Sequence, residues 1–366
     1  MESKRLLEFD AIRGVAALCI VLFHYGSSYQ WSNLHPFHYL RYLEQFVQLF
    51  FILSGFFILL SIKRIKRSLD FIVGRFARLY PVYWISVITT VIITSTITKP
   101  RTDKIYDIVL NFSIFQEFFG ARNVNIVYWT LTLELAFYII ILSLYKFKLI
   151  KQIEWICGFW LVVIFLNTFK AYIPSPTALA MPIHYENSLS GDFSLSTLTN
   201  TSISNVIDFL KDFLKSKFLL LGGRADLFIS GIFLYQIKTF GFSKYRLGMI
   251  IFCVFTKAID YSPDTPRYAF LFFAFFVIVI YLAIYGKLSV LANQSLAFLG
   301  IISYSLYLTH LQVQWLLHPI LAPVPNELGL IIKVLSAIAV ASFLTFKVEQ
   351  PAFGLLKSYY KNKFGD

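Results

Sequence analysis

The chain of 366 residues is 57% hydrophobic and 18% aromatic, and only 14% of its residues are charged. A soluble domain would carry about a quarter charged residues, so the composition excludes an ordinary soluble fold and indicates a multi-pass membrane protein. The formal net charge of +13 is better explained by positive residues that collect in cytoplasmic loops than by nucleic acid, which we do not expect as a partner. Cys19, Cys157 and Cys253 lie in apolar stretches and match no metal-ligand spacing, so no metal site is expected.

Apolar stretches along the whole chain predict an all-α fold, a polytopic transmembrane helical bundle of about ten spans with both termini in the cytoplasm. The first stretch follows Lys4 and Arg5 without a small-residue cleavage site, so we expect a retained span and not a signal peptide. Lys and Arg are about twice as frequent in the predicted inner segments as in the outer ones, which favours an even number of spans. Residues 1–366 are expected to form a single integral-membrane domain with no appended soluble domain. The predicted spans are residues 9–29, 45–62, 79–98, 126–145, 153–170, 218–237, 247–261, 268–286, 296–317 and 327–347.

The first span carries Arg13 and His24, eleven residues apart. Eleven residues turn an α-helix through about 1100°, within about 20° of whole turns, so both side chains leave one face roughly 16 Å apart. Ionisable groups at membrane depth are costly and are functional by default. The pair suits a long anionic ligand whose charged head lies at the arginine and whose reactive end lies at the histidine. Asp10, one turn earlier, could orient the guanidinium; the alternative is a chance alignment of two structural residues.

The inner loop predicted at 63–78 holds a second candidate. Arg75 and Arg78 are three residues apart and point the same way on a helix, where two guanidiniums can grip a phosphate bidentately. Ordinary positive-inside topology explains the basic cluster at 63–67 equally well.

Polar residues inside later spans form a third group. Glu134 places a carboxylate among apolar residues, which predicts a proton carrier, a partner for an arginine or a structural ion pair. Arg224 and Asp226 are either site residues or a structural pair between helices. Tyr307 and His310 share a helix face, and His310 could equally be a core residue. Charged residues near span ends are expected to snorkel to the interface: Lys257, Asp260 and Lys333.

Two predicted outer loops stand apart from the spans. Residues 99–125 carry four phenylalanines among polar residues and predict a short amphipathic helix at the interface. Residues 171–217 form a long segment rich in Ser, Thr and Asn, which is typical of a functional or disordered loop.

The chain contains no Gly-x-Ser-x-Gly elbow, no Gly-rich phosphate loop and no His-Glu-x-x-His motif. The absence of the Gly-x-Ser-x-Gly elbow in particular disfavours a serine acyl-enzyme. Direct transfer with His24 as general base is the simpler mechanism.

Taken in order, seven short motifs resemble acyltransferase family 3, the multi-pass membrane acyltransferases that modify cell-surface sugars. The likeness covers almost the whole chain. Leu135 stands where many members carry a second acid, Thr309 where Trp is common and Asp226 where Glu is common, but the arginine–histidine pair is intact. The motifs are residues 9–17 with His24, then 51–58, 75–81, 129–138, 224–231, 303–310 and 349–351.

The resemblance implies a membrane O-acyltransferase of the bacterial inner (cytoplasmic) membrane. Its donor would be cytoplasmic acyl-CoA, most often acetyl-CoA, acting as a co-substrate and not as a permanently bound cofactor. Its acceptor would be a carbohydrate hydroxyl, as in O-antigen of lipopolysaccharide, capsule, peptidoglycan, a lipid-linked intermediate, a secreted glycan or a macrolide-like small molecule. The acyl group, the position acylated and the oligomeric state stay open, as does a separate partner protein. Specificity for the acceptor is expected in residues 99–125 and 171–217.

In this interpretation Arg13, Arg75 and Arg78 hold the CoA phosphates, and the pantetheine arm runs beside the first span to His24. Imidazole suits a general base because its unperturbed pKa is about 6.5, close to working pH. Glu134 completes the expected catalytic set. Donors to the developing oxyanion are sought among Ser54, Trp129 and Tyr307. The residues expected to support the substrates are Asp10, Ser54, Trp129, Tyr138, Arg224, Asp226, Tyr307 and His310.

Two other classes of function stay open from the sequence. A transporter or flippase of an envelope glycan precursor would use the intramembrane charges as a path, and such proteins are commonly built from repeats, of which we find none. A non-catalytic assembly subunit would use the same charges only to bind helices together. Such a scaffold should survive the change His24→Ala, whereas an enzyme should lose turnover at equal abundance.

Overall fold

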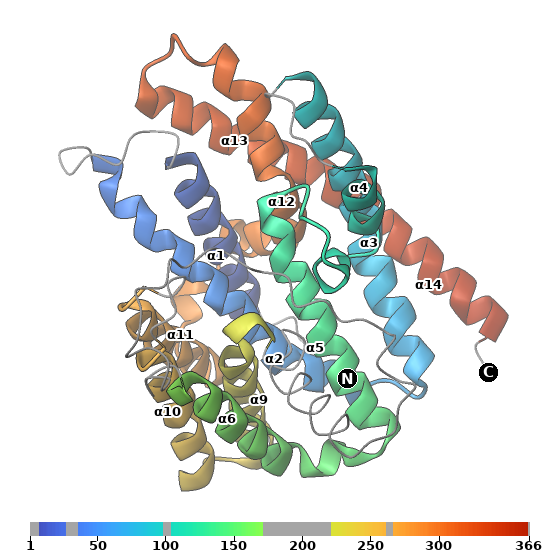
Figure 1. The fold of residues 1–366 in the computed structure, drawn as a ribbon, viewed down its shortest axis with the longest axis vertical. Coiled ribbons are helices and arrows are strands. Elements are labelled where there is room, and N and C mark those ends of the chain that lie inside the picture. The colour runs from blue at the N-terminus through green and yellow to red at the C-terminus, as the bar shows by residue number, and fades with distance from the viewer. Residues whose placement is uncertain (1–6, 27–35, 98–103, 171–220, 261–265, 365–366) are drawn as a thin grey trace, which may run out of the picture.

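The computed structural model describes residues 7–26, 36–97, 104–170, 221–260 and 266–364. Within these residues all regular secondary structure is helical and there is no strand, which confirms the predicted all-α class (Figure 1). The helices of the bundle are α1 (Leu7–Gly26), α2 (Val47–Ile62), α3 (Ser68–Thr96), α5 (Trp129–Lys146), α6 (Ile153–Lys170), α9 (Ala225–Phe240), α10 (Lys244–Ala258), α11 (Ala269–Ile284), α12 (Gln294–Ile320), α13 (Asn326–Leu344) and α14 (Gln350–Phe364). Shorter helical segments are η1 (Pro36–Phe46), α4 (Ile105–Asn111), η2 (Gln116–Phe119), η3 (Ile126–Tyr128), η4 (Leu149–Gln152), η6 (Leu221–Gly223), η7 (Ser289–Leu291) and the π-helical η8 (Thr345–Glu349).

Every predicted span contains one of these helices. Six helical stretches in the described part of the chain are long and apolar enough to cross a bilayer, among them α3, α12 and the continuous run Asn326–Phe364. The protein is therefore a polytopic helical bundle, while the count of ten and the side on which the termini lie stay predictions.

The predicted inner loop 63–78 is wrong in its second half, because α3 begins at Ser68. Asp70 caps this helix: its carboxylate accepts the backbone N–H of Arg67 at 2.9 Å and that of Lys66 at 3.2 Å. A carboxylate in the first turn satisfies unpaired N–H groups and complements the helix dipole. Arg75 and Arg78 consequently sit on the first turns of a long helix and not in a loop.

The segment that follows α3 contains a short helix, α4, but its four phenylalanines lie after that helix, and its place at the membrane interface stays a prediction. Asp107 accepts the N–H of Arg122 at 2.9 Å, and Asn111 donates to the carbonyl of Arg122 at 2.7 Å. Tyr83 of α3 donates to the carbonyl of Asn111 at 2.6 Å, which holds the segment against α3. The other predicted outer loop, 171–217, lies outside the described residues.

Two helix pairs cross at glycines. α1 packs most extensively along α12, and α2 along α9. A Cβ on Gly14 would lie 2.5 Å from the backbone nitrogen of Gly300, and one on Gly300 would meet the carbonyl of Asp10. Gly55 and Gly231 are in the same close contact between α2 and α9. Small residues let helix backbones approach closely, as membrane helices commonly require.

The glycine crossing fixes the register of α1 on α12. The two helices run parallel, since Gly14 lies against Gly300 and the hydroxyl of Tyr25 donates to the carbonyl of His310 at 2.8 Å. His24 and His310 both lie ten residues beyond their glycines. The crossing therefore brings the two histidines side by side.

Candidate active site

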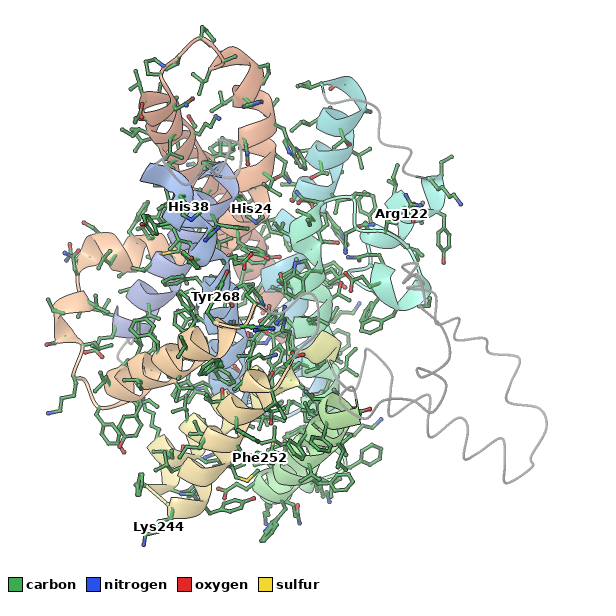
Figure 2. All side chains as sticks on the ribbon, turned by 60° about the vertical axis from the view of Figure 1, so that its left-hand side comes forward. His24, His38, Arg122, Lys244, Phe252 and Tyr268 are labelled. Carbon is green, nitrogen blue, oxygen red and sulfur yellow. The ribbon has the colours of Figure 1, made fainter. Side chains whose placement is uncertain are left out.

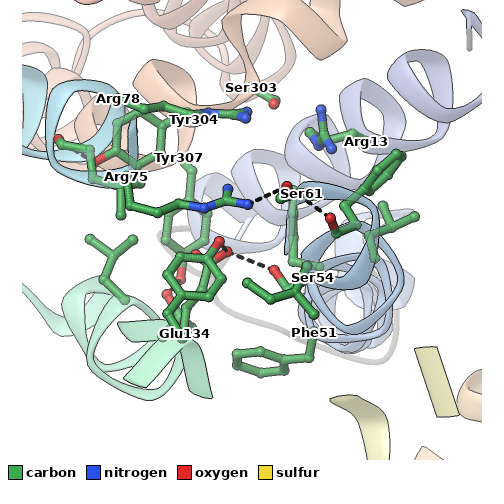
Figure 3. Close-up of a pocket in the computed structure, with 18 of the residues that line it drawn as sticks. Arg13, Phe51, Ser54, Ser61, Arg75, Arg78, Glu134, Ser303, Tyr304 and Tyr307 are labelled. Atoms are coloured by element: carbon green, nitrogen blue, oxygen red, sulfur yellow. Dashed lines mark hydrogen bonds between the residues drawn. The ribbon is translucent and has the colours of Figure 1, made fainter. Parts of the chain in front are cut away.

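A cavity of about 400 Å³ opens between α1, α2, α3, α5 and α12 (Figure 3). This volume is within the range of small-molecule sites, which are mostly apolar with a few convergent polar groups. Its walls are largely aromatic and aliphatic, and the polar groups come from all five helices. The polar and charged residues that line it are Asp10, Arg13, Ser54, Ser61, Arg64, Arg75, Arg78, Thr130, Glu134, Tyr138, Ser303, Tyr304 and Tyr307.

Four arginines face two carboxylates in this lining, so the cavity carries an excess of positive charge. Arg64 and Arg78 are exposed, whereas Arg13 and Arg75 are half-buried. A gradient from exposed to half-buried guanidiniums suits an anionic ligand that enters head first and keeps part of its charge near water.

The two deeper arginines are held by contacts on separate helices. Arg13 pairs with Asp10 at 3.5 Å and lies over the ring of Phe57 at 5.4 Å. Arg75 donates to the hydroxyl of Ser61 at 2.7 Å and lies 4.6 Å from the ring centroid of Tyr138. The sequence expectation that Asp10 orients Arg13 agrees with this geometry.

Glu134 of α5 lines the cavity beside Ser54 of α2 (Figure 3). Its Oε1 accepts a hydrogen bond from Ser54 Oγ at 2.7 Å and a second from the hydroxyl of Tyr138. Among the described residues the carboxylate takes part in hydrogen bonds and in no ion pair closer than 4.0 Å. Glu134 thus joins α2 to α5, and through Tyr138 it supports the ring under Arg75.

Tyr307 lines the cavity from α12. Its hydroxyl accepts from Thr130 Oγ1 at 2.9 Å and donates to the carbonyl of Val127 at 3.1 Å. Its ring lies 6.0 Å from that of Phe50. Since the hydroxyl proton is already donated, Tyr307 acts in this geometry as a wall and an anchor.

His24 does not line the cavity, although the sequence places it on the same face as Arg13. Figure 2 shows it in the half of the bundle remote from Lys244. The ring of His310 lies 5.0 Å from that of His24 and 6.0 Å from that of Tyr307. Ser303, Tyr307 and His310 follow one stripe of α12, so the histidines stand one turn beyond the cavity wall.

Three further predicted site residues, Trp129, Arg224 and Asp226, stay outside the lining. Arg224 lies over the indole of Trp129 at 5.9 Å, and Trp129 contacts the cavity residue Phe51 with ring centroids 5.8 Å apart. Asp226 is paired with Lys257 at 3.4 Å and not with Arg224.

The expectation that Lys257 snorkels is wrong. Its side chain is 2% exposed, because Asp226, Asp260 and the carbonyl of Gly223 together satisfy the ammonium inside the bundle. Lys333 is 2% exposed as well, so it does not extend to water either.

The sequence reasoning missed several lining residues. Arg64 was visible in the basic cluster 63–67, but a positive-inside bias explains such clusters without a site. Ser61 and Tyr304 gave no separate signal, because a lone serine or tyrosine in an apolar helix is ordinary; Tyr304 is fixed by donating to the carbonyl of Leu79 at 2.6 Å.

The polytopic helical bundle defines an integral membrane protein, and its interior holds an arginine-lined cavity. The family model described as "Acyltransferase domain" matches residues 6–346. The chain therefore belongs to acyltransferase family 3, and its general activity is that of a membrane acyltransferase. No curated protein and no solved structure matches it.

Proposed function

We propose that the protein transfers an acyl group, acetyl in the first instance, from cytoplasmic acyl-CoA to a hydroxyl of an envelope polysaccharide or lipid-linked sugar such as O-antigen. Arg13, Arg75 and Arg78 hold the CoA phosphates, and Arg64 adds a fourth cation at the mouth. His24 is the general base. The protein would work in the bacterial inner membrane.

One observation carries the proposal: the cavity that is lined by four arginines is also lined by Tyr307, whose ring is 6.0 Å from that of His310. A phosphate head bound at the arginines would direct a long apolar arm along the wall formed by α2 and α12. Phe50, Phe51 and Leu53 supply that apolar wall. The thioester would then reach the histidine end of the face.

In the reaction, the acceptor oxygen attacks the thioester carbonyl while His24 removes the hydroxyl proton. The tetrahedral intermediate collapses, the carbon–sulfur bond breaks, and His24 returns the proton to the departing CoA thiolate. The products are an ester of the acceptor and free CoA, so atoms and charge balance without an acyl-enzyme.

The developing oxyanion needs a hydrogen-bond donor. Ser54 and Tyr307 already donate their hydroxyl protons to Glu134 and to Val127. Either would have to give up that bond, and Trp129 lies outside the cavity lining, so all three residues stay candidates for this role. Glu134 serves by holding Ser54 and Tyr138. Arg224, which lies over the face of Trp129, would meet the acceptor from the outer side.

The test is transfer of label from acetyl-labelled CoA into envelope saccharide by membranes that carry wild type, His24→Ala or His318→Ala. His318 is a matched control because it lies exposed near the end of α12. We expect His24→Ala to lose about 10²–10⁴-fold in turnover at equal protein level, as removal of a general base does, and His318→Ala to match wild type.

Equal labelling by wild type and His24→Ala would remove His24 from the mechanism. Absence of label with every protein would show that acetyl-CoA is not the donor or envelope saccharide not the acceptor. A scaffold role would give normal assembly of the envelope with His24→Ala and no label from any form of the protein.

A further inference from the structure

His310 is a fully buried imidazole whose two nitrogens differ. Nδ1 lies 2.8 Å from the carbonyl of Tyr307 and 3.2 Å from that of Leu306. Nε2 is buried and has no hydrogen-bond partner in the described part of the chain. A histidine in the core of a helix bundle normally has both nitrogens satisfied, because an unpaired buried polar atom is costly.

The contacts of Nδ1 fix the tautomer. Carbonyl oxygens only accept, so Nδ1 must carry the proton. Nε2 then offers a lone pair and can only accept a hydrogen bond. His310 is thus held as an acceptor that points away from its own helix backbone.

The ring beside this acceptor is that of His24, at 5.0 Å between centroids and an interplanar angle of 40°. The rings are tilted against each other, and a centroid distance of 5.0 Å leaves room for one N–H···N hydrogen bond between them. The pairing is rigid: Tyr25 binds the backbone of His310, Gln314 donates to the carbonyl of His24 at 3.3 Å, and the Gly14–Gly300 crossing fixes the register.

Resting on the proposed function, we infer that His310 is the positioning residue of the general base. Its Nε2 accepts the ring N–H of His24 after a rotation of the His24 ring, which leaves the other His24 nitrogen with its lone pair toward the acceptor hydroxyl. When His24 takes the hydroxyl proton, the resulting imidazolium keeps its N–H on Nε2. His310 itself neither gains nor loses a proton.

The arrangement resembles a Ser-His-Asp triad, in which a third group orients the general base. Here the third group is a neutral imidazole and not a carboxylate. A carboxylate would need a compensating charge at membrane depth, whereas a neutral ring fixed on two carbonyls does not. The role of His310 is therefore orientation and not charge.

The experiment compares His310→Leu, His310→Gln and the matched control His318→Leu in the acetyl-transfer assay. Leucine removes the acceptor, while the glutamine Oε1 can take the place of Nε2. We expect His310→Leu to lower kcat about 10–100-fold with the KM for acetyl-CoA within about twofold. His310→Gln should recover most of kcat, and His318→Leu should equal wild type.

A double variant separates positioning from packing. If His310 acts only through His24, adding His310→Leu to His24→Ala should cause no further loss of the residual rate. Three results would overturn the inference: full additivity of the two changes, a wild-type kcat in His310→Leu, or an equal loss in the Leu and Gln variants. If His24→Ala is inactive in the same assay, the proposed function still stands. An inactive wild type would overturn both. Protein level and melting temperature of each variant identify any loss that is only a failure to fold.

Discussion

The two ends of the site are built in opposite ways. The arginine end is a cavity with four arginines, two of them exposed. The histidine end is a pair of neighbouring imidazole rings, with His310 fully buried and no charged partner on its ring in the described residues. One end offers charge and access, and the other offers fixed geometry.

This difference matches two tasks of the proposed reaction, which are binding a phosphate head and transferring a proton. A phosphate head must bind and leave again, so its site should remain partly hydrated and carry several guanidiniums. A proton transfer gains from exclusion of water and from groups that need no reorganisation. The wall of α12 from Ser303 to Tyr307 connects the two ends, so one helix carries both.

The largest expected effect comes from breaking the register that connects the ends. In Gly300→Val the new side chain would meet the backbone carbonyl of Asp10, which cannot move without shifting α1. We expect the cost to reach or exceed the upper end of the about 1–3 kcal/mol that is typical of overpacked cores. Little monodisperse protein should be recovered in detergent, and its melting temperature should fall.

The matched control for this change is Gly248→Ala on α10, where a new Cβ has nothing within 4 Å. Alanine favours a helix over glycine by about 0.8–1.0 kcal/mol, so this variant should keep or raise the melting temperature. A tolerated Gly300→Val, with normal yield and turnover, would contradict the idea that the glycine crossing aligns the two ends.

The next largest effect is expected from the loss of the half-buried Arg13 guanidinium. Arg13→Gln should raise the KM for acetyl-CoA while kcat changes little, since the lost interaction holds the head of the donor and not its reacting end. A charge-assisted hydrogen bond contributes about 1.5–3 kcal/mol, which predicts a roughly 10–100-fold rise. Initial rates over a range of acetyl-CoA concentrations measure it. A fall in kcat at constant KM would instead place Arg13 at the reacting atoms.

A smaller effect is expected from the aromatic support of Arg75. Tyr138→Leu removes the ring that lies 4.6 Å from the guanidinium, whereas Tyr138→Phe removes only the hydroxyl donated to Glu134. A cation–π contact is worth about 0.5–2 kcal/mol, so the leucine variant should raise the KM for acetyl-CoA by roughly 2–30-fold. The phenylalanine variant keeps this ring, so its KM should stay closer to that of wild type. The lost hydrogen bond, about 0.5–1.5 kcal/mol, sets an upper bound of roughly 13-fold. Equal losses in both would assign the effect to the hydroxyl.

The sequence predicts the helices and the face of α1 because both depend on local periodicity. Arg13 and His24 share a face by helix geometry alone, and all ten predicted ranges hold helices. The predicted start of α3 is wrong because the only local sign of that start is Asp70, which caps the helix and stands among many basic residues that indicate a loop.

The sequence could not predict which distant helices contact each other. Nothing local indicates that Gly14 faces Gly300 or that His310 is the neighbour of His24, because each contact joins segments almost 290 residues apart. The same holds for Lys257. Its position near a span end predicts a side chain that extends to water, but the structure places Asp226 and the carbonyl of Gly223 beside its ammonium.

The smallest expected effect distinguishes the mouth of the cavity from its interior. Arg64 and Arg78 are exposed, so Arg64→Gln should change the KM for acetyl-CoA by less than about fivefold, in line with the about 0.2–1 kcal/mol of exposed ion pairs. At about 1 M salt the screening length falls to about 3 Å, so this difference from wild type should vanish there. The effect of Arg13→Gln should persist, because a half-buried guanidinium is screened much less. KM measured at low and high salt for wild type and both variants makes the comparison. If the two variants lost their effects in parallel, the arginines would form one solvated patch, and the gradient from mouth to interior would not exist.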